Sequence, residues 1–141
     1  MIRFTSAMYF ALVVSLLIFS TACGGSNVVS TPPSVNLSGM WKGTWASNQS
    51  PRGGNVEAVI SQSGTSLSGT ATVTGSPCFT SGSVSGAVSG NNVTFGVLFS
   101  GGQQALFSGT VGSGGTIISG TYAVSGGLCN GDTGSFNLTK Q

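Results

Sequence analysis

Residues 118–129, ISGTYAVSGGLC, repeat the pattern of residues 67–78, LSGTATVTGSPC, and the two cysteines lie 51 positions apart. Each copy has an apolar residue followed by Ser-Gly, a second inward-facing position, turn-forming residues and a cysteine. This order is typical of a β-strand and the loop that leaves it. The repetition therefore predicts an all-β domain with an internal duplication of about 51 residues.

The centre of the repeat is a short motif, apolar-Ser-Gly-x-apolar, which occurs five times. The copies are LSGMW at 37–41, LSGTA at 67–71, VSGAV at 84–88, FSGTV at 107–111 and ISGTY at 118–122. Side chains alternate across a strand, so the apolar residues and the glycine face one side and the serine faces the other. An inward glycine in mid-strand predicts either a close aromatic ring or a kink where the sheet coils tightly.

Alternation with a period of two continues to the end of the chain, with turn residues between the apolar runs. It predicts eight strands near residues 38–46, 55–61, 66–74, 81–89, 92–100, 104–111, 116–124 and 134–140. The connections are short and rich in Gly, Asn and Ser, so they are hairpin loops between antiparallel strands. Residues 37–141 are therefore expected to form an eight-stranded antiparallel up-and-down meander barrel, and the alternative is a two-sheet β-sandwich.

Charge is scarce in this chain: its 141 residues include four Lys and Arg, two Asp and Glu, and no histidine. No basic surface can form to hold a phosphate backbone, so we expect no nucleic-acid partner. Glu57 is predicted at an outward strand position and Asp132 in a loop, so the two carboxylates should not form a glycosidase-type pair. Without histidine to activate a nucleophile or bind a metal, the sequence predicts a protein that is not an enzyme and has no metal or cofactor.

The N-terminal segment has the pattern of an export signal. One basic residue precedes an apolar run at 7–19, which is too short to span a bilayer comfortably and leads to the sequence STAC at 20–23. STAC resembles the lipobox of bacterial lipoproteins. The resemblance implies a signal helix over 1–22 that is removed, palmitate-type acylation of Cys23 and a flexible tether over 23–36. The protein would then be exported and anchored in the membrane of the cell envelope, the outer membrane being favoured where the host has two. The alternatives are ordinary cleavage without acylation and an anchor that is not cleaved.

The other two cysteines, Cys78 and Cys129, follow the third and the seventh predicted strands. In an up-and-down meander the odd-numbered loops emerge at the same end, so the two thiols can meet. An exported compartment allows them to oxidise, and we therefore expect a Cys78–Cys129 disulfide. Two free thiols and a metal-binding pair are the alternatives.

The first predicted strand contains Gly-x-Trp twice, as GMW at 39–41 and GTW at 43–45. This pattern resembles the opening strand of lipocalins and of avidin-type barrels. The resemblance implies a barrel with a ligand cavity at one mouth, but it does not imply biotin, because the chain has no further tryptophan. The candidates to line a small apolar site are Trp41, Trp45, Phe95, Phe107 and Tyr122. The alternative is that these side chains are an ordinary core, since the interior of an eight-stranded barrel is just wide enough for its own side chains.

The sequence as a whole predicts a non-catalytic, membrane-anchored, exported lipoprotein that binds a small apolar ligand in its barrel. The alternative is a structural module of the envelope, or one that binds a protein or glycan on its hydroxyl-rich outer face, without an interior ligand. The sequence predicts neither the identity of the ligand nor the oligomeric state.

Overall fold

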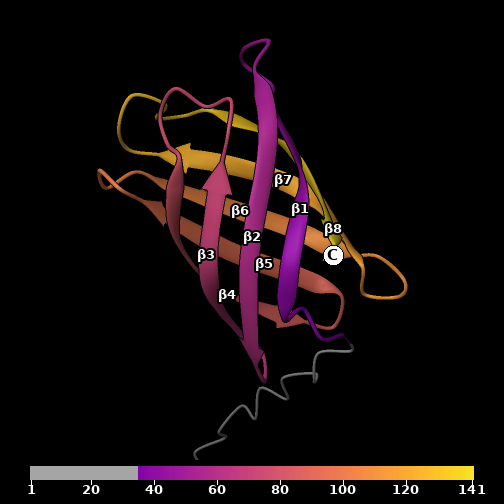
Figure 1. The fold of residues 1–141 in the computed structure, drawn as a ribbon. Coiled ribbons are helices and arrows are strands. Elements are labelled where there is room, and N and C mark those ends of the chain that lie inside the picture. Colours follow the sequence, from indigo (N-terminus) through magenta and orange to yellow (C-terminus); the bar gives the residue numbers. More distant parts are fainter. Residues whose placement is uncertain (1–34) are drawn as a thin grey trace, which may run out of the picture.

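A computed structural model describes residues 35–141, so the signal over 1–22, Cys23 and nearly all of the tether lie outside the described residues. The strands are β1 (Gly39–Ser47), β2 (Gly53–Ser63), β3 (Ser66–Val73), β4 (Ser81–Ser89), β5 (Asn92–Phe99), β6 (Gln104–Val111), β7 (Ile117–Ser125) and β8 (Thr133–Lys140). Each pairs antiparallel with the next, and β8 pairs with β1, so the sheet closes on itself (Figure 1). The predicted eight-stranded meander barrel is confirmed, and the closed ring excludes the two-sheet sandwich.

The predicted strand boundaries agree with the structure to within two residues. The largest difference is in β2, which is longer than predicted at both ends. Gly53 pairs with Ala46 at one end, and Gln62 pairs with Leu67 at the other. Gly53 and Gln62 have no apolar side chain to extend the alternating pattern, so only backbone pairing places them in the strand. Within residues 35–141, no helix is long and apolar enough to cross a membrane.

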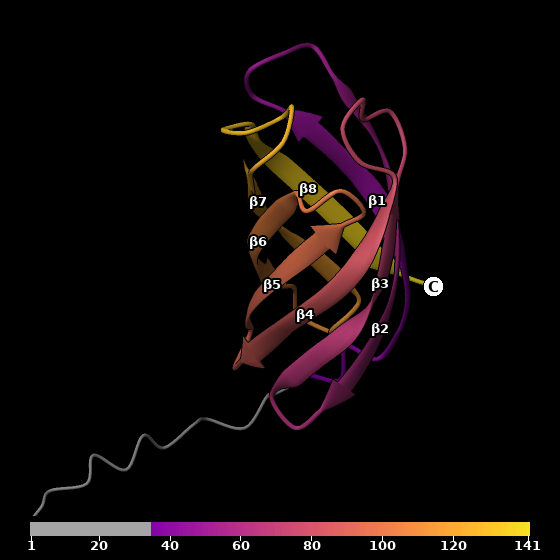
Figure 2. The ribbon, with the colours of Figure 1, turned by 90° about the vertical axis from the view of Figure 1, so that its left-hand side faces the viewer.

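The two ends of the barrel differ in their loops (Figures 1 and 2). We use the name mouth end for the end with the loops after β1, β3, β5 and β7, which span 48–52, 74–80, 100–103 and 126–132. At the opposite end, named the N-terminal end, the chain enters the barrel, and the loops there span 64–65, 90–91 and 112–116. The loops of the mouth end are the longer set, so they have enough chain to cover the opening.

Side chains along each strand alternate between the barrel interior and the solvent, and the interior is apolar. Among residues 35–141 no charged residue and no Ser, Thr, Asn or Gln is buried. The aromatic residues at the predicted inward positions are all buried: Trp41, Trp45, Phe95, Phe99, Phe107, Tyr122 and Phe136. Burying a large apolar side chain contributes roughly 1.5–3 kcal/mol, so these rings supply much of the stability of the fold.

Glycines at inward positions allow neighbouring strands to approach closely. A Cβ at Gly43 would overlap the backbone carbonyl oxygen of Asn137 in β8. A Cβ at Gly109 would lie 2.5 Å from the carbonyl oxygen of Ser119 and 3.1 Å from the ring of Phe136. These separations are shorter than the 3.5–4.0 Å or so of an ordinary carbon contact. Both predicted reasons for the inward glycines, a close aromatic ring and tight coiling of the sheet, therefore apply.

Candidate functional site

The five side chains predicted to line an apolar site all lie inside the barrel, but not in one place. Trp45 and Tyr122 form an edge-to-face pair with ring centroids 6.0 Å apart, and Phe107 lies 5.8 Å from Tyr122. Phe95 stacks on Phe107 at 5.0 Å. Trp41, on the same face of β1 as Trp45, lies towards the N-terminal end. Four of the five therefore form one cluster, in the middle and mouth half of the barrel.

The interior around this cluster is filled. The void that Trp45, Phe107 and Tyr122 help to line has a volume of about 10 Å³. A single water molecule needs about 10–15 Å³, so this void has no room for an organic ligand. At this place the side chains form a packed core, as in the alternative interpretation of the sequence, and not a preformed ligand cavity.

Phe79 completes this packing, although nothing in the period-two pattern predicts it. It lies in the β3–β4 loop, yet its side chain is buried and lines the same void. Its ring stacks on Phe99 of β5 with centroids 4.3 Å apart. The sequence feature that could have identified Phe79 is a lone aromatic residue in a loop of Gly, Ser, Pro and Thr, directly after a cysteine expected to be crosslinked. Phe79 thus closes the mouth end of the core.

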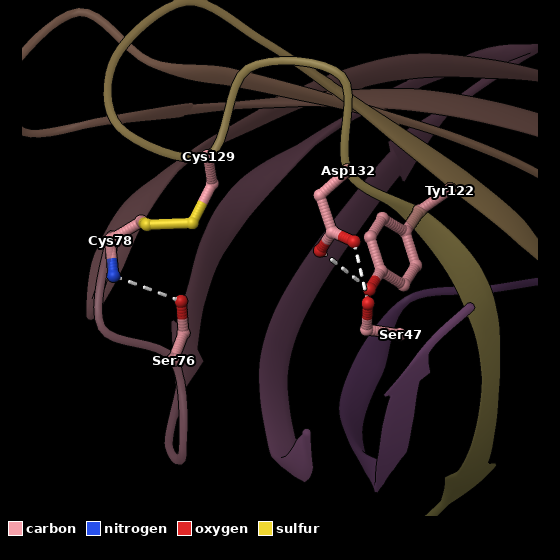
Figure 3. Close-up of a disulfide and its surroundings, with 6 residues drawn as sticks. All are labelled: Ser47, Ser76, Cys78, Tyr122, Cys129 and Asp132. Carbon is pink, nitrogen blue, oxygen red and sulfur yellow. Dashed lines mark hydrogen bonds between the residues drawn. A yellow bond between two sulfur atoms is a disulfide. The ribbon is translucent and has the colours of Figure 1, made fainter. Parts of the chain in front are cut away.

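A disulfide joins Cys78 of the β3–β4 loop to Cys129 of the β7–β8 loop, with Cα atoms 6.0 Å apart (Figure 3). The predicted pairing is confirmed. In the closed ring, these loops are separated by four strands in either direction, so they come from opposite sides of the opening. The crosslink therefore spans the opening. In the chain-entropy model, closing a loop of this length stabilises the fold by about 4 kcal/mol.

Beside the disulfide, the mouth end has an open pocket of about 280 Å³. The pocket is lined by Trp45, Gln49, Ser50, Arg52, Ser76, Pro77, Leu128, Cys129, Asn130 and Asp132. Its walls come from the β1–β2, β3–β4 and β7–β8 loops, and the inward-facing Trp45 lies at its base. Two further hollows, on the outer wall of β3 to β5 and beside Lys140, are larger but shallower and more open to solvent. The mouth pocket is therefore the better-formed place for a small molecule.

Two hydroxyl groups hold the carboxylate of Asp132 in this pocket (Figure 3). Asp132 Oδ1 accepts a hydrogen bond from Ser47 Oγ at 2.6 Å, and Oδ2 accepts one from Tyr122 Oη at 3.1 Å. Burial, and then the negative charge of Asp132, raise the pKa of Tyr122, so its phenol stays protonated and remains a donor. A carboxylate has about four lone-pair positions, so Asp132 can still accept hydrogen bonds from a ligand.

Further hydrogen bonds fix the walls of the pocket. Gln49 Nε2 donates to the carbonyl oxygen of Gly131 at 2.6 Å, which ties the β1–β2 loop to the β7–β8 loop. Trp45 Nε1 donates to the carbonyl oxygen of Thr74 at 2.9 Å, which fixes the indole ring against the end of β3. The pocket is thus ordered before any ligand arrives, which lowers the entropy lost on binding.

The charged side chains of residues 35–141 differ in their partners. Lys42 and Glu57 form an exposed ion pair on the outer wall, with an N to O distance of 2.8 Å. Lys140 Nζ donates to a backbone carbonyl at the N-terminal end at 2.8 Å. Within the described part of the chain, the Arg52 side chain has no hydrogen bond or ion pair, and it lines the mouth pocket. Arg52 and Asp132 are thus two opposite charges that share one pocket.

The ionisable groups do not form an acid-base pair in this part of the molecule. Glu57 binds Lys42 on the outer wall, whereas Asp132 lies in the mouth, so the two carboxylates do not converge. In residues 35–141 there is also no group of three or more His, Cys, Asp or Glu that could hold a metal ion.

Hydroxyl groups form rows on the outer wall. The facing residues are Ser68, Thr70 and Thr72 of β3 and, in the same order, Ser85, Ser83 and Ser81 of β4. No charged side chain interrupts these rows, so this wall presents neutral hydrogen-bonding groups. It is the surface on which the glycan or protein of the alternative interpretation would bind.

No protein-family model matches the chain, and no curated protein matches it. Its function is therefore inferred from its residues and their geometry.

Proposed function

We propose that this chain is an exported, lipid-anchored and non-catalytic binding protein of the bacterial cell envelope, which holds a small polar ligand in the mouth pocket. The contrast between a filled interior and an open mouth carries this proposal: about 10 Å³ in the core against about 280 Å³ at the mouth. Pockets for drug-sized ligands have about 300–1,000 Å³. A ligand of roughly one ring suits the mouth pocket, whereas the interior apolar site expected from the sequence would need the core to open.

Two features support export and lipid anchoring. The sequence STAC at 20–23 resembles a lipobox in which Cys23 is the acylated residue. The Cys78–Cys129 disulfide suits an oxidising compartment outside the cytoplasm. Because the chain enters the barrel at the N-terminal end, a tether from Cys23 would leave the mouth pocket at the opposite end, away from the point of attachment.

The chemistry of the pocket supports a binding role without catalysis. Ser50 and Ser76 bring hydroxyl groups to it, but no histidine or lysine lines the pocket to activate them. Arg52 cannot act as a general base, because its guanidinium stays protonated in proteins. Asp132 is held by two donors, which makes it a fixed hydrogen-bond acceptor.

Native mass spectrometry of the protein extracted from its own membrane tests the anchoring. We expect a chain that begins at Cys23, carries acyl groups and has an intact disulfide. Cys23→Ser is the control variant, and it should lose both the acyl mass and the membrane association. A wild-type chain without acyl groups would overturn the proposed anchor.

Tryptophan fluorescence with a panel of apolar dyes and lipids tests where the ligand binds. We expect no saturable shift, because the interior has no space for these probes. A saturable shift that persists in Trp45→Phe, where Trp41 is the remaining tryptophan, would place an apolar ligand inside the barrel and overturn the assignment to the mouth pocket.

A further inference from the structure

The lining of the mouth pocket retains hydrogen-bonding groups of both kinds. Gln49 uses Nε2 to bind Gly131 O, which leaves its Oε1 as an acceptor. Asn130 accepts a hydrogen bond at Oδ1 from Gly126 N at 2.9 Å, which leaves its Nδ2 as a donor. Within residues 35–141, neither remaining atom has a hydrogen bond. The pocket thus presents a donor and an acceptor from side chains that are already held in position.

Arg52 gives the pocket a cation that has no hydrogen-bond or ion-pair partner among residues 35–141. Lys42 and Lys140, the other cations of the described residues, each donate to an oxygen within the chain. The guanidinium of Arg52 has five N–H donors in a planar fork, a geometry that matches a carboxylate in a two-point contact. Arg52 is exposed, so its guanidinium is accessible to an anionic group on a ligand in the pocket.

We propose that the ligand is a sugar ring that carries a carboxylate, a uronic acid unit. This inference rests on the proposed function and names the ligand class of that same pocket. A sugar hydroxyl both donates and accepts, so it can pair with Asn130 Nδ2, with Gln49 Oε1 and with the free lone pairs of Asp132. Its carboxylate would bind Arg52, and Pro77 would give the ring an apolar contact.

A zwitterionic amino acid is the competing class, because it also has a carboxylate for Arg52. Its ammonium would bind the free lone pairs of Asp132, which a sugar hydroxyl can also reach. An amino acid without hydroxyl groups would have no further group to bind the exposed amides of Gln49 and Asn130, whereas the hydroxyls of a sugar can bind both, so the lining favours the sugar acid.

Titration of the isotope-labelled full-length protein, in detergent where it carries lipid, tests the ligand class. The probes are galacturonate, galactose and glutamate, and NMR follows the amide signals of residues 48–52 and 126–132. We expect galacturonate to shift these signals to saturation, and galactose to bind about tenfold more weakly because it cannot make the charged hydrogen bonds to Arg52. Added salt should weaken the binding of galacturonate more than that of galactose.

Arg52→Gln is the decisive variant, and Lys42→Gln is its matched control on the outer wall. Arg52→Gln should reduce the affinity for galacturonate to that for galactose, whereas Lys42→Gln should leave it unchanged. Equal weakening in both variants would indicate a general charge effect and overturn the inference. If galacturonate does not shift the two loops but glutamate does, the sugar class is wrong and the mouth-pocket function stands. If no probe shifts them, the proposed function fails as well.

Discussion

The two ends of the barrel close the same apolar core by different means. At the N-terminal end, Leu37 is fully buried, and its backbone N–H donates to Gln62 Oε1 at 2.7 Å. Gln62 Nε2 donates in turn to the carbonyl oxygen of Val35 at 3.2 Å, so one side chain fixes the entering chain. At the mouth end, the closing side chain is Phe79, and a disulfide between two loops holds it in place.

This difference shows how one barrel can be closed and yet present a site. Around Gln62, the polar groups of the N-terminal end bond to one another, so they are used in closing it. At the mouth, a covalent crosslink adds to the hydrogen bonds that Gln49, Ser47 and Tyr122 make. Asn130, Gln49 and Arg52 nevertheless keep groups that can bind a ligand.

Removal of the crosslink should have the largest effect on global stability, and its local effect should fall on the mouth end. In a Cys78→Ala/Cys129→Ala variant, we expect the free energy of unfolding to fall by about 4 kcal/mol in urea denaturation, because the unfolded chain gains entropy. For exchange by local opening, the rate should rise in residues 74–80 and 126–132, while residues 35–37 keep their protection. A uniform loss of protection at both ends would show that the disulfide is not specific to the mouth.

Replacement of the two closing side chains compares the ends directly. Phe79→Ala should lower the free energy of unfolding by about 3–5 kcal/mol and Leu37→Ala by about 2–5 kcal/mol, since each leaves a cavity in the core. Only the Phe79 cavity should bind a small apolar probe such as benzene, detected as a rise in the melting temperature, because the mouth loops leave an entry path. Equal binding of benzene by Leu37→Ala would contradict the proposed difference between the two ends.

Two glutamines brace the two ends and form a matched pair. Gln62→Ala should destabilise the protein by about 2 kcal/mol, because it leaves the partly buried N–H of Leu37 without a partner. Gln49→Ala removes one exposed hydrogen bond to Gly131 and should change the free energy of unfolding by less than about 1 kcal/mol. Thermal or urea unfolding measures both. A larger loss of stability in Gln49→Ala than in Gln62→Ala would contradict the proposed difference between the two ends.

Tyr122→Phe should have the smallest effect at neutral pH, about 1 kcal/mol for the lost hydrogen bond to Asp132. The contribution of Tyr122 to stability depends on pH. Burial and Asp132 raise the pKa of Tyr122 in the folded state. The protonated phenol therefore contributes its full stabilisation of the fold below the ordinary tyrosine pKa of about 10, and this stabilisation is lost as the pH rises above that value. Wild-type stability should therefore fall more steeply above that pH than that of Tyr122→Phe. Parallel curves of stability against pH would show that Tyr122, the only tyrosine of residues 35–141, does not titrate in this way.

The sequence predicts the strands well because their signal is local. Alternation and Gly-rich turns locate all eight, and the parity of the loops brings Cys78 and Cys129 to one end. Trp41 and Trp45 show the limit of this signal. They share a face, but four residues of strand separate them by about 13 Å. Only the closed structure shows that Trp45 belongs to the mouth and Trp41 does not.

The mouth pocket is harder to predict because three loops build it. Arg52, Pro77 and Asn130 have no periodic pattern, and their convergence depends on tertiary contacts. The period-two pattern also does not predict that the interior is filled. Inward glycines suggest free volume, but in the structure neighbouring backbone occupies the space beside Gly43 and Gly109.

The crosslink also changes how the chain is connected. The segment from Cys78 to Cys129 holds β4 to β7 and is closed by the disulfide into a covalent ring. A protease that cuts one bond in residues 90–91, 100–103 or 112–116 would open this ring without releasing a fragment, even from the denatured chain. Half of the strands are therefore protected against loss by a single cut, as a cyclic peptide is, until a thiol reductant separates the two pieces.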